Sequence, residues 1–297
     1  MSHDPQQPAD LSGNAREPYR LNPIVLRHQE ESRRWIARAA DAVAACRAIV
    51  LGAGACEEIP LAELVARFGL VTLNDVELAP LERAVARLDT QGREKIDLQV
   101  ADLTGTAQPL LEKIGNALQT AADPGSASER MAEIVASQAA GGLLLAGKYD
   151  LVVASCVLSQ LHVGLAHQAA DLFAIRFPGK LEQLRGAECW TTALYRLARR
   201  IEARFIDDLI GLVADGGLIY LSESVQMCYV ERTPSGPWQT KGTYRMLRST
   251  DLSDYVDGRF SIAQRGRWEW VVSPPAEAGQ TGRLYDVQAL VLRVSRV

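Results

Sequence analysis

Two patterns of hydrophobic and polar residues alternate along this chain: short apolar runs and longer segments in which apolar residues recur at helical spacing. Short, mainly apolar runs stand at 49–51, 70–73, 151–154 and 218–221, and between them apolar residues recur at helical spacing, as in 57–68. Runs of this length are typical of buried strands, whereas the longer periodic segments are typical of amphipathic helices. The pattern therefore predicts an α/β fold in which helices connect the strands of an open sheet.

The C-terminal part of the sequence departs from this alternation. Two strands are predicted here, near 260–272 and at 284–294, and because only a loop separates them they must pair antiparallel. Trp268 and Trp270 have the same parity and share one face of their strand. The segment 227–241 is aromatic and contains Pro and Gly, and it is expected to be a long loop.

Further helices are predicted outside the strand-linking segments. Residues 22–47 form an amphipathic helix, which either covers an edge of the core or acts as a lid. The Ala-rich segment 108–147 predicts two helices, with Ser126 and Glu129 as a capping box for the second. Helices are also expected at 167–177 and 188–213, separated by a Pro-Gly break.

Composition narrows the class of protein. The 297 residues carry a formal net charge of −4, which disfavours nucleic acid as a partner. Five cysteines without a CxxC pair indicate reduced thiols in the cytoplasm rather than zinc ligands or disulfides. No apolar run of 18 residues occurs, and the polar residues 1–18 predict a disordered tail rather than a signal peptide.

The first three strands end in residues suited to ligand binding. Gly52, Ala53 and Gly54 follow the first apolar run and would let the backbone approach a ligand closely. Asp75 lies 23 positions past Gly52, near the offset of about 20 at which a carboxylate binds ribose hydroxyls. Asp102 ends the next strand, and it either faces the same crevice or caps a helix.

The fourth strand runs into small and polar residues. Ser155 and Cys156 leave space for a ligand, and Gln160 follows within the same segment. His162 comes soon after the strand end and is either a general base or a surface histidine on a helix. Cys156 is interpreted as a packed thiol rather than a nucleophile.

These motifs together resemble the class I S-adenosylmethionine (SAM) dependent methyltransferases. The motifs occur in the family's order: LGAGACEE, NDVE, ADL, YDLVVASCVLSQL and ADGGLIYLSE. The resemblance implies a Rossmann-like, seven-stranded, mostly parallel sheet with an antiparallel last strand and helices on both faces. By resemblance, the residues that bind the cofactor are Gly52, Ala53, Gly54, Cys56, Asp75, Val76, Asp102, Leu103, Ser155 and Cys156.

One departure from the family concerns the usual third glycine, which is Cys56 here. Its side chain would bring the helix closer to the cofactor, where Glu57 or Glu58 meets the cofactor's ammonium group. A dehydrogenase is the weaker interpretation, because it would need that glycine and a Tyr-x-x-x-Lys base, and the sequence has neither.

The resemblance implies a single methyltransferase domain at 19–297, with a lid helix at 19–47 and helical insertions at 105–146 and 163–200. The expected reaction is methyl transfer to oxygen or nitrogen of a small molecule or natural product, with SAM as cofactor and no metal. The alternative is a methyltransferase-fold protein that methylates or binds a protein partner. Residues expected to touch the substrate are Tyr19, His28, Gln160, Tyr195, Trp238 and Tyr244.

Overall fold

The strands form one mixed sheet. The computed structural model describes residues 23–234, 238–247, 249–256, 258–273, 275 and 279–295, so Tyr19 and the expected tail at 1–18 lie outside the described residues. The strand order is β3-β2-β1-β4-β5-β8-β7, and β6 pairs with the outer part of β5. The strands are β1 (Arg47–Leu51), β2 (Leu70–Asp75), β3 (Ile96–Val100), β4 (Tyr149–Ser155), β5 (Val213–Arg232), β6 (Trp238–Arg245), β7 (Phe260–Ser273) and β8 (Thr281–Val294).

Strands β1 to β5 are parallel, and β8 returns antiparallel between β5 and β7. The expected Rossmann-like sheet with an antiparallel close is confirmed. The strand count differs from the expected seven, because the described residues contain eight paired strands. The order reverses between β1 and β4, which creates the crevice at the carboxyl ends of the strands where such sheets bind ligands.

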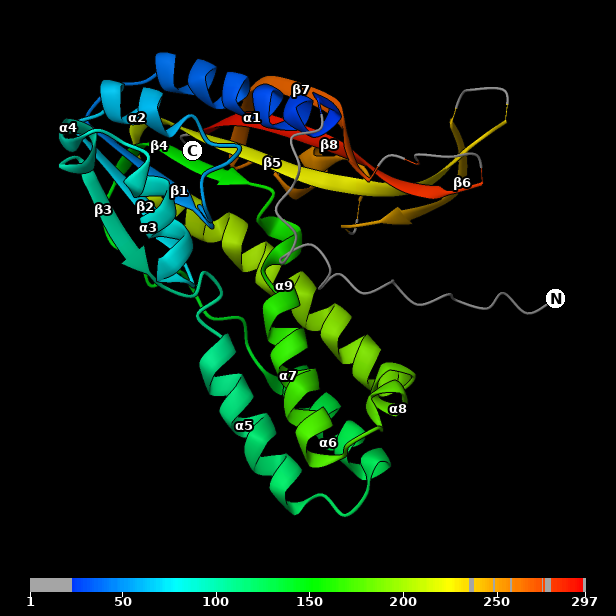
Figure 1. The fold of residues 1–297 in the computed structure, drawn as a ribbon. Helices are drawn as coiled ribbons and strands as arrows, with labels where there is room; N and C mark the ends of the chain where they lie inside the picture. The colour runs from blue at the N-terminus through cyan, green and yellow to red at the C-terminus, as the bar shows by residue number, and fades with distance from the viewer. Residues whose placement is uncertain are drawn as a thin grey trace.

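Helices cover both faces of the sheet. The helices of the described residues are α1 (Pro23–Asp41), α2 (Leu61–Arg67), α3 (Leu78–Ala86), α4 (Thr90–Arg93), α5 (Ala107–Thr120), α6 (Pro124–Ser137), α7 (Val163–Arg176), α8 (Leu181–Arg185) and α9 (Glu188–Leu212), with short 3-10 turns η2 (Leu158–Gln160) and η3 (Leu252–Tyr255). Figure 1 shows α1 and α2 over one face and α9 crossing the other.

The apolar residues of each central strand alternate between these two faces. In β4, Leu151 and Val153 belong to the core under α1 and α2, whereas Val152 and Ala154 belong to the core against α9. This alternation follows from the period of two in a strand. Because both faces are covered, the strand reads as a continuous apolar run in the sequence.

The two expected helical insertions pack into one bundle. Helices α5, α6, α7 and α8 and the first half of α9 share a core of their own, which projects away from the sheet in Figure 1. Its centre contains Ile114, Met131, Phe173 and Leu197, all buried. The insertions therefore form a layer of their own beside one end of the sheet.

The expected capping box in this bundle is wrong. Helix α6 begins at Pro124, and the carboxylate of Asp123 caps it by accepting the N–H groups of Gly125 and Ser126. Asp is a favoured cap, and the fixed φ of proline suits the first helical position. Ser126 therefore lies inside the first turn and does not begin the helix.

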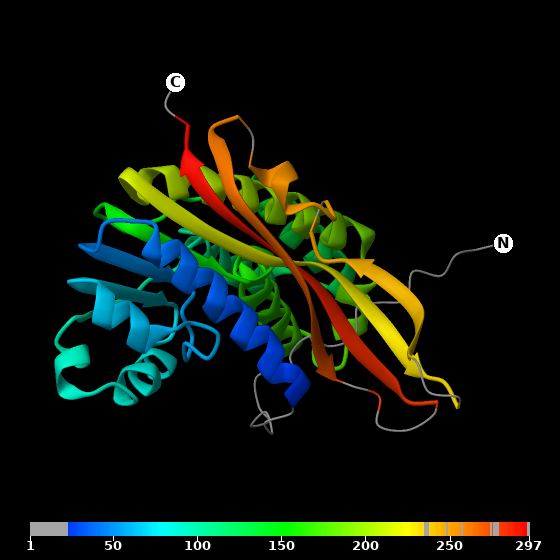
Figure 2. The ribbon, with the colours of Figure 1, turned by 90° about the horizontal axis from the view of Figure 1, so that it is seen from above.

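The expected loop at 227–241 is also wrong. Strand β5 continues to Arg232, and β6 folds back along it, so that β5, β6 and β8 form a long twisted extension (Figure 2). On this extension Tyr229 packs edge-on against Tyr244, with ring centroids 5.3 Å apart. Pairing of β5 on both edges satisfies its backbone groups, which a loop would have left to water.

Candidate active site

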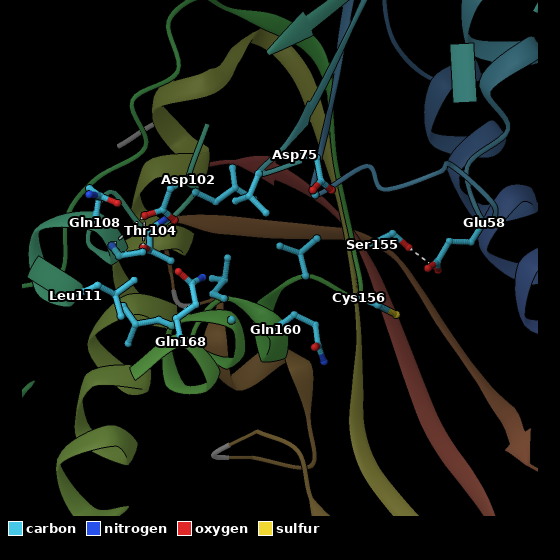
Figure 3. Close-up of a pocket in the computed structure, with 18 residues that line it drawn as sticks. Glu58, Asp75, Asp102, Thr104, Gln108, Leu111, Ser155, Cys156, Gln160 and Gln168 are labelled. Carbon is cyan, nitrogen blue, oxygen red and sulfur yellow. Dashed lines mark hydrogen bonds between the residues drawn. The ribbon is translucent and has the colours of Figure 1, made fainter. Parts of the chain in front are cut away.

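A cavity of about 590 Å³ lies at the carboxyl ends of β1, β2 and β4, beside the segment that follows β3. This volume is within the range of about 300 to 1,000 Å³ that is typical of small-molecule sites. Each strand-end segment contributes to the lining, through Gly52, Asp75, Leu103 and Ser155. Figure 3 shows Asp75, Asp102 and Ser155 approaching this space from separate elements.

The backbone conformation of the turn after β1 favours glycine at two positions. Gly52 has φ of 61°, and a Cβ placed on it would come within 2.7 Å of Val157 Cγ2. Gly54 has φ of 50°, but a Cβ there would meet no atom within 4 Å. Positive φ favours glycine at both positions, whereas only Gly52 also lacks space for a side chain.

Asp75 braces this turn from the end of β2. Its Oδ2 accepts the N–H of Gly54 at 2.8 Å, and its Oδ1 accepts the N–H of Glu77 at 3.2 Å. The side chain is only partly buried and lines the cavity together with the exposed Val76. Asp75 therefore joins the glycine turn to the cavity wall, at the position where the sequence predicts a ribose contact.

Asp102 performs the capping role that the sequence left open, and it lines the cavity as well. Its carboxylate accepts the N–H groups of Thr104, Thr106 and Ala107 at 2.8 to 3.2 Å, just before helix α5. The Thr104 hydroxyl also donates to it at 2.8 Å. These four bonds fix the backbone that presents Leu103 to the cavity.

The segment after β4 turns sharply into the cavity wall. Cys156 has φ of 52°, which is uncommon for a residue with a side chain. Burial raises the pKa of the Cys156 thiol well above its usual value, with the carboxylates of Glu58 and Glu223 acting in the same direction. The thiol therefore stays protonated near neutral pH, which is consistent with a packed thiol and not with a nucleophile.

Cys56, which the sequence resemblance aligns with a third glycine, also adopts a left-handed conformation, with φ of 54°. Its side chain is buried in the core under α1 and is not among the residues that line the cavity. Burial raises the pKa of this thiol to about 12. Helix α2 begins only at Leu61, so Cys56 shapes the turn while the next residues remain outside the helix.

The two glutamates after Cys56 point to different places. Glu57 is exposed, and its backbone carbonyl accepts a bond from Arg33. Glu58 lines the cavity, and its Oε2 accepts the hydroxyl of Ser155 at 3.0 Å (Figure 3). Of the two candidates for an ammonium contact, only Glu58 faces the cavity.

His28 of α1 holds Glu58 from behind. The indole N–H of Trp268 donates to His28 Nδ1 at 2.9 Å, and His28 Nε2 lies 3.0 Å from Glu58 Oε2. The Trp270 ring stacks on the imidazole with centroids 4.1 Å apart, so both tryptophans contact His28 from one face of β7, as their parity predicts. His28 is 2% exposed and contacts Glu58, not the cavity.

This network also bears on metal binding. His28, Glu58 and Cys156 bring potential ligand atoms within 4.8 Å of one another. However, the Trp268 N–H can only donate, so Nδ1 must carry the lone pair and Nε2 the proton of the neutral ring. A protonated Nε2 suits the bond to Glu58 and lacks the lone pair that a metal ligand needs.

Sequence reasoning missed Glu223 of β5, which supports the cavity lining from behind. It is fully buried, and its carboxylate accepts the N–H and the hydroxyl of Ser159 at 2.9 and 2.8 Å, together with the N–H of Ser224 at 2.8 Å. Burial raises the pKa of Glu223 to about 7, against the lowering effect of these bonds. Glu223 thereby anchors η2, the turn that carries Gln160 into the cavity lining.

The remaining expected residues do not converge on the cavity. His162 precedes α7, where burial and the charge of Arg199 lower its pKa, and it does not line the cavity. Tyr195 is exposed on α9 beside Arg199, Trp238 begins β6 at 36% exposure, and Tyr244 packs on the β extension. Of the expected substrate residues that the structure describes, Gln160 alone lines the cavity.

The far wall of the cavity comes from the helical insertions. Gln108 and Leu111 of α5 and Leu165 and Gln168 of α7 complete the lining. No local pattern indicated that these residues would line a cavity, because their helices show ordinary amphipathic spacing. Among the described lining residues there are three carboxylates, Glu58, Asp75 and Asp102, and no lysine or arginine.

Comparison of the sequence with protein-family models and with curated proteins gave no match. Solved structures with a similar fold include a SAM-dependent methyltransferase from Leishmania major, which is 13% identical over 92% of this chain and 74% of its own, at a TM-score of 0.40. A putative RNA methyltransferase from Pyrococcus horikoshii is 9% identical over 90% of this chain and 83% of its own, at 0.40.

Mitomycin 7-O-methyltransferase is 10% identical over 91% of this chain and 54% of its own, at a TM-score of 0.39. These proteins are named for acceptors as different as RNA and mitomycin. At such identities the likeness concerns the fold alone. No described helix is both long and apolar enough to cross a membrane.

Proposed function

We propose that the protein is a SAM-dependent methyltransferase that transfers a methyl group to oxygen or nitrogen of a small molecule. The supporting observation is that Gly52, Asp75, Leu103 and Ser155 meet at one cavity. In the proposal, Asp75 binds the ribose hydroxyls, and Val76, Asp102 and Leu103 flank the adenine. The amino-acid half of the cofactor lies along Gly52, Gly54 and Ser155.

The charge of the cavity supports a cationic cofactor over a dinucleotide. Its lining contains three carboxylates without a lysine or arginine. A pyrophosphate would be repelled there, whereas a sulfonium with an ammonium group would be attracted. The open space beside Gly54 also fits a ligand that passes close to the backbone.

When bound, SAM supplies an electrophilic methyl group, which an acceptor displaces in line with the sulfur. The protein's task is then mainly to align the reactants and exclude water, with a base required only for an acceptor of high pKa. In this proposal Gln160 and the turn at Cys156 orient the acceptor. The protonated Cys156 thiol forms no covalent intermediate.

A small acceptor is favoured by the helical wall that bounds one side of the cavity. Helices α5 and α7, one from each insertion, supply its far wall through residues such as Gln108 and Gln168. The exposed Trp238, which would mark a protein-binding face, lies on β6 and is not among the cavity residues. The protein-partner alternative therefore has less support.

The test is calorimetric titration with SAM and with S-adenosylhomocysteine. Replacement Asp75→Ala should weaken binding about a hundredfold, since two charge-assisted hydrogen bonds are lost. Asp75→Asn keeps an oxygen that can accept the Gly54 N–H but removes the charge that binds the ribose hydroxyls. It therefore distinguishes a loss of ribose binding from a loss of support for the turn. Glu77→Ala, an exposed neighbour of equal charge, is the control. Binding of NAD instead of SAM would refute the proposal.

A further inference from the structure

Of the three carboxylates among the described residues that line the cavity, Glu58 is the one that has no part in binding the adenosine half of the cofactor as proposed. Glu58 lies in the turn between β1 and α2, and its side chain is 28% exposed. It faces the same space as Gly52 and Ser155, on the side of the cavity opposite Leu111 and Gln168 (Figure 3). Asp75 lies between Asp102 and Glu58 in Figure 3, so with the adenine at Asp102 and the ribose at Asp75, as proposed, Glu58 would lie toward the amino-acid half of the cofactor.

The three hydrogen-bond partners of Glu58 come from two elements, α1 and β4, and converge on one oxygen. Oε2 accepts the Ser155 hydroxyl at 3.0 Å and the Ser32 hydroxyl at 3.4 Å, and it lies 3.0 Å from His28 Nε2. Among the described residues, no hydrogen bond reaches Oε1. The carboxylate is thus held in one orientation, with its second oxygen left for another donor.

The partners of Glu58 orient its charge but do not neutralise it. Ser32 and Ser155 are neutral, and the Trp268 N–H selects the neutral tautomer of His28. Among the described residues, no lysine or arginine forms an ion pair with Glu58. A partly buried carboxylate without a cation favours a positively charged ligand group, because charge-assisted hydrogen bonds are stronger than neutral ones.

We infer that Glu58 binds the α-ammonium group of the cofactor and thereby selects ligands that carry the amino acid over the bare thioether nucleoside. The inference rests on the proposed function and goes beyond it in naming the group that is recognised. His28 and Ser155 act as positioning residues, since they hold the carboxylate and do not themselves carry the recognition. Glu57, which has the same charge one residue earlier, is exposed and takes no part.

The test compares three ligands by calorimetric titration: S-adenosylhomocysteine, 5′-methylthioadenosine, and 5′-(3-carboxypropylthio)adenosine, which keeps the carboxylate and lacks the amine. Replacement Glu58→Gln should weaken S-adenosylhomocysteine about 10- to 100-fold, the range expected for a hydrogen bond to a charged group. The other two ligands should change by less than about threefold. Glu57→Gln, with the same change in net charge, should leave all three affinities unaltered.

A second comparison uses ligand affinities of the wild-type protein, so it does not depend on whether the variant folds. The wild type should bind the amine-free analogue about as weakly as Glu58→Gln binds S-adenosylhomocysteine, because both remove the same contact. Equal binding of the amine-free analogue and S-adenosylhomocysteine, or equal losses for all three ligands in Glu58→Gln, would overturn the inference and leave the proposed function standing. Failure of the wild type to bind any of the three would instead refute the proposed function.

Discussion

Replacement Glu223→Gln should change how the stability of the protein depends on pH. The carboxyl of Glu223 is fully buried, and its pKa is raised from 4.5 to about 7 by burial, with Glu58 adding to the effect through its charge. The carboxylate keeps three hydrogen bonds from Ser159 and Ser224, which lower the pKa but do not offset the desolvation. Glutamine has the shape of the protonated carboxyl and cannot ionise.

The sign follows from proton binding. The folded state holds the proton of Glu223 up to about pH 7, whereas the unfolded state releases it near its ordinary value. Folding therefore favours the neutral form, and the stability that Glu223 contributes at low pH is lost as pH rises through about 7. A pKa change of this size corresponds to about 3 kcal/mol, of which about 2 to 3 kcal/mol falls between pH 5 and pH 8.5.

The measurement is urea unfolding of the wild type and of Glu223→Gln, followed by tryptophan fluorescence at intervals from pH 5 to pH 8.5. The wild-type free energy of unfolding, minus that of the variant, should fall by about 2 to 3 kcal/mol across this range. Glu82→Gln, an exposed glutamate on α3, should give a nearly constant difference. A constant difference for Glu223→Gln would show that its carboxyl does not ionise near pH 7 in the folded protein.

Two further substitutions test the turn and the network around the cavity. Gly52→Ala should destabilise more than Gly54→Ala in thermal unfolding, because both glycines have positive φ but only Gly52 would place a Cβ against Val157; equal losses would contradict the clash. Trp268→Phe removes the donor to His28 Nδ1 and should cost about 1 to 3 kcal/mol in urea unfolding, the penalty for a buried unpaired acceptor; an unchanged midpoint would exclude this bond as a stabilising contact.

Much of the central sheet could be predicted from the sequence because the signals for it are local. The apolar runs of β1, β2 and β4 are flanked by turns and helices, and the short loop before β8 forces an antiparallel pair. The glycines after β1 and the offset to Asp75 are likewise local. The glycine turn and Asp75 both lie at the strand ends where the sequence pattern predicts them.

The elements that the sequence failed to predict depend on distant partners. Strand β6 is largely exposed and polar, so it lacks the alternation of a half-buried strand and is defined only by its pairing with β5. Glu223 lies 64 positions from Ser159, and nothing in either local segment indicates that they meet. His162 illustrates the reverse error, since its position after a strand suggested the cavity but its side chain lies elsewhere.

By itself, the sequence determined that a glycine turn, two strand-end aspartates and a small-residue segment would meet at the carboxyl edge of a parallel sheet. The alternation of strands and helices requires that edge to exist, whatever the remaining packing. Only the tertiary structure decided between Glu57 and Glu58, joined His28 and Trp268 to the cavity wall, and buried Glu223 behind η2. The physical reason is that strand ends are set by local hydrogen bonding and periodicity, whereas the environment of a charge depends on every element packed around it.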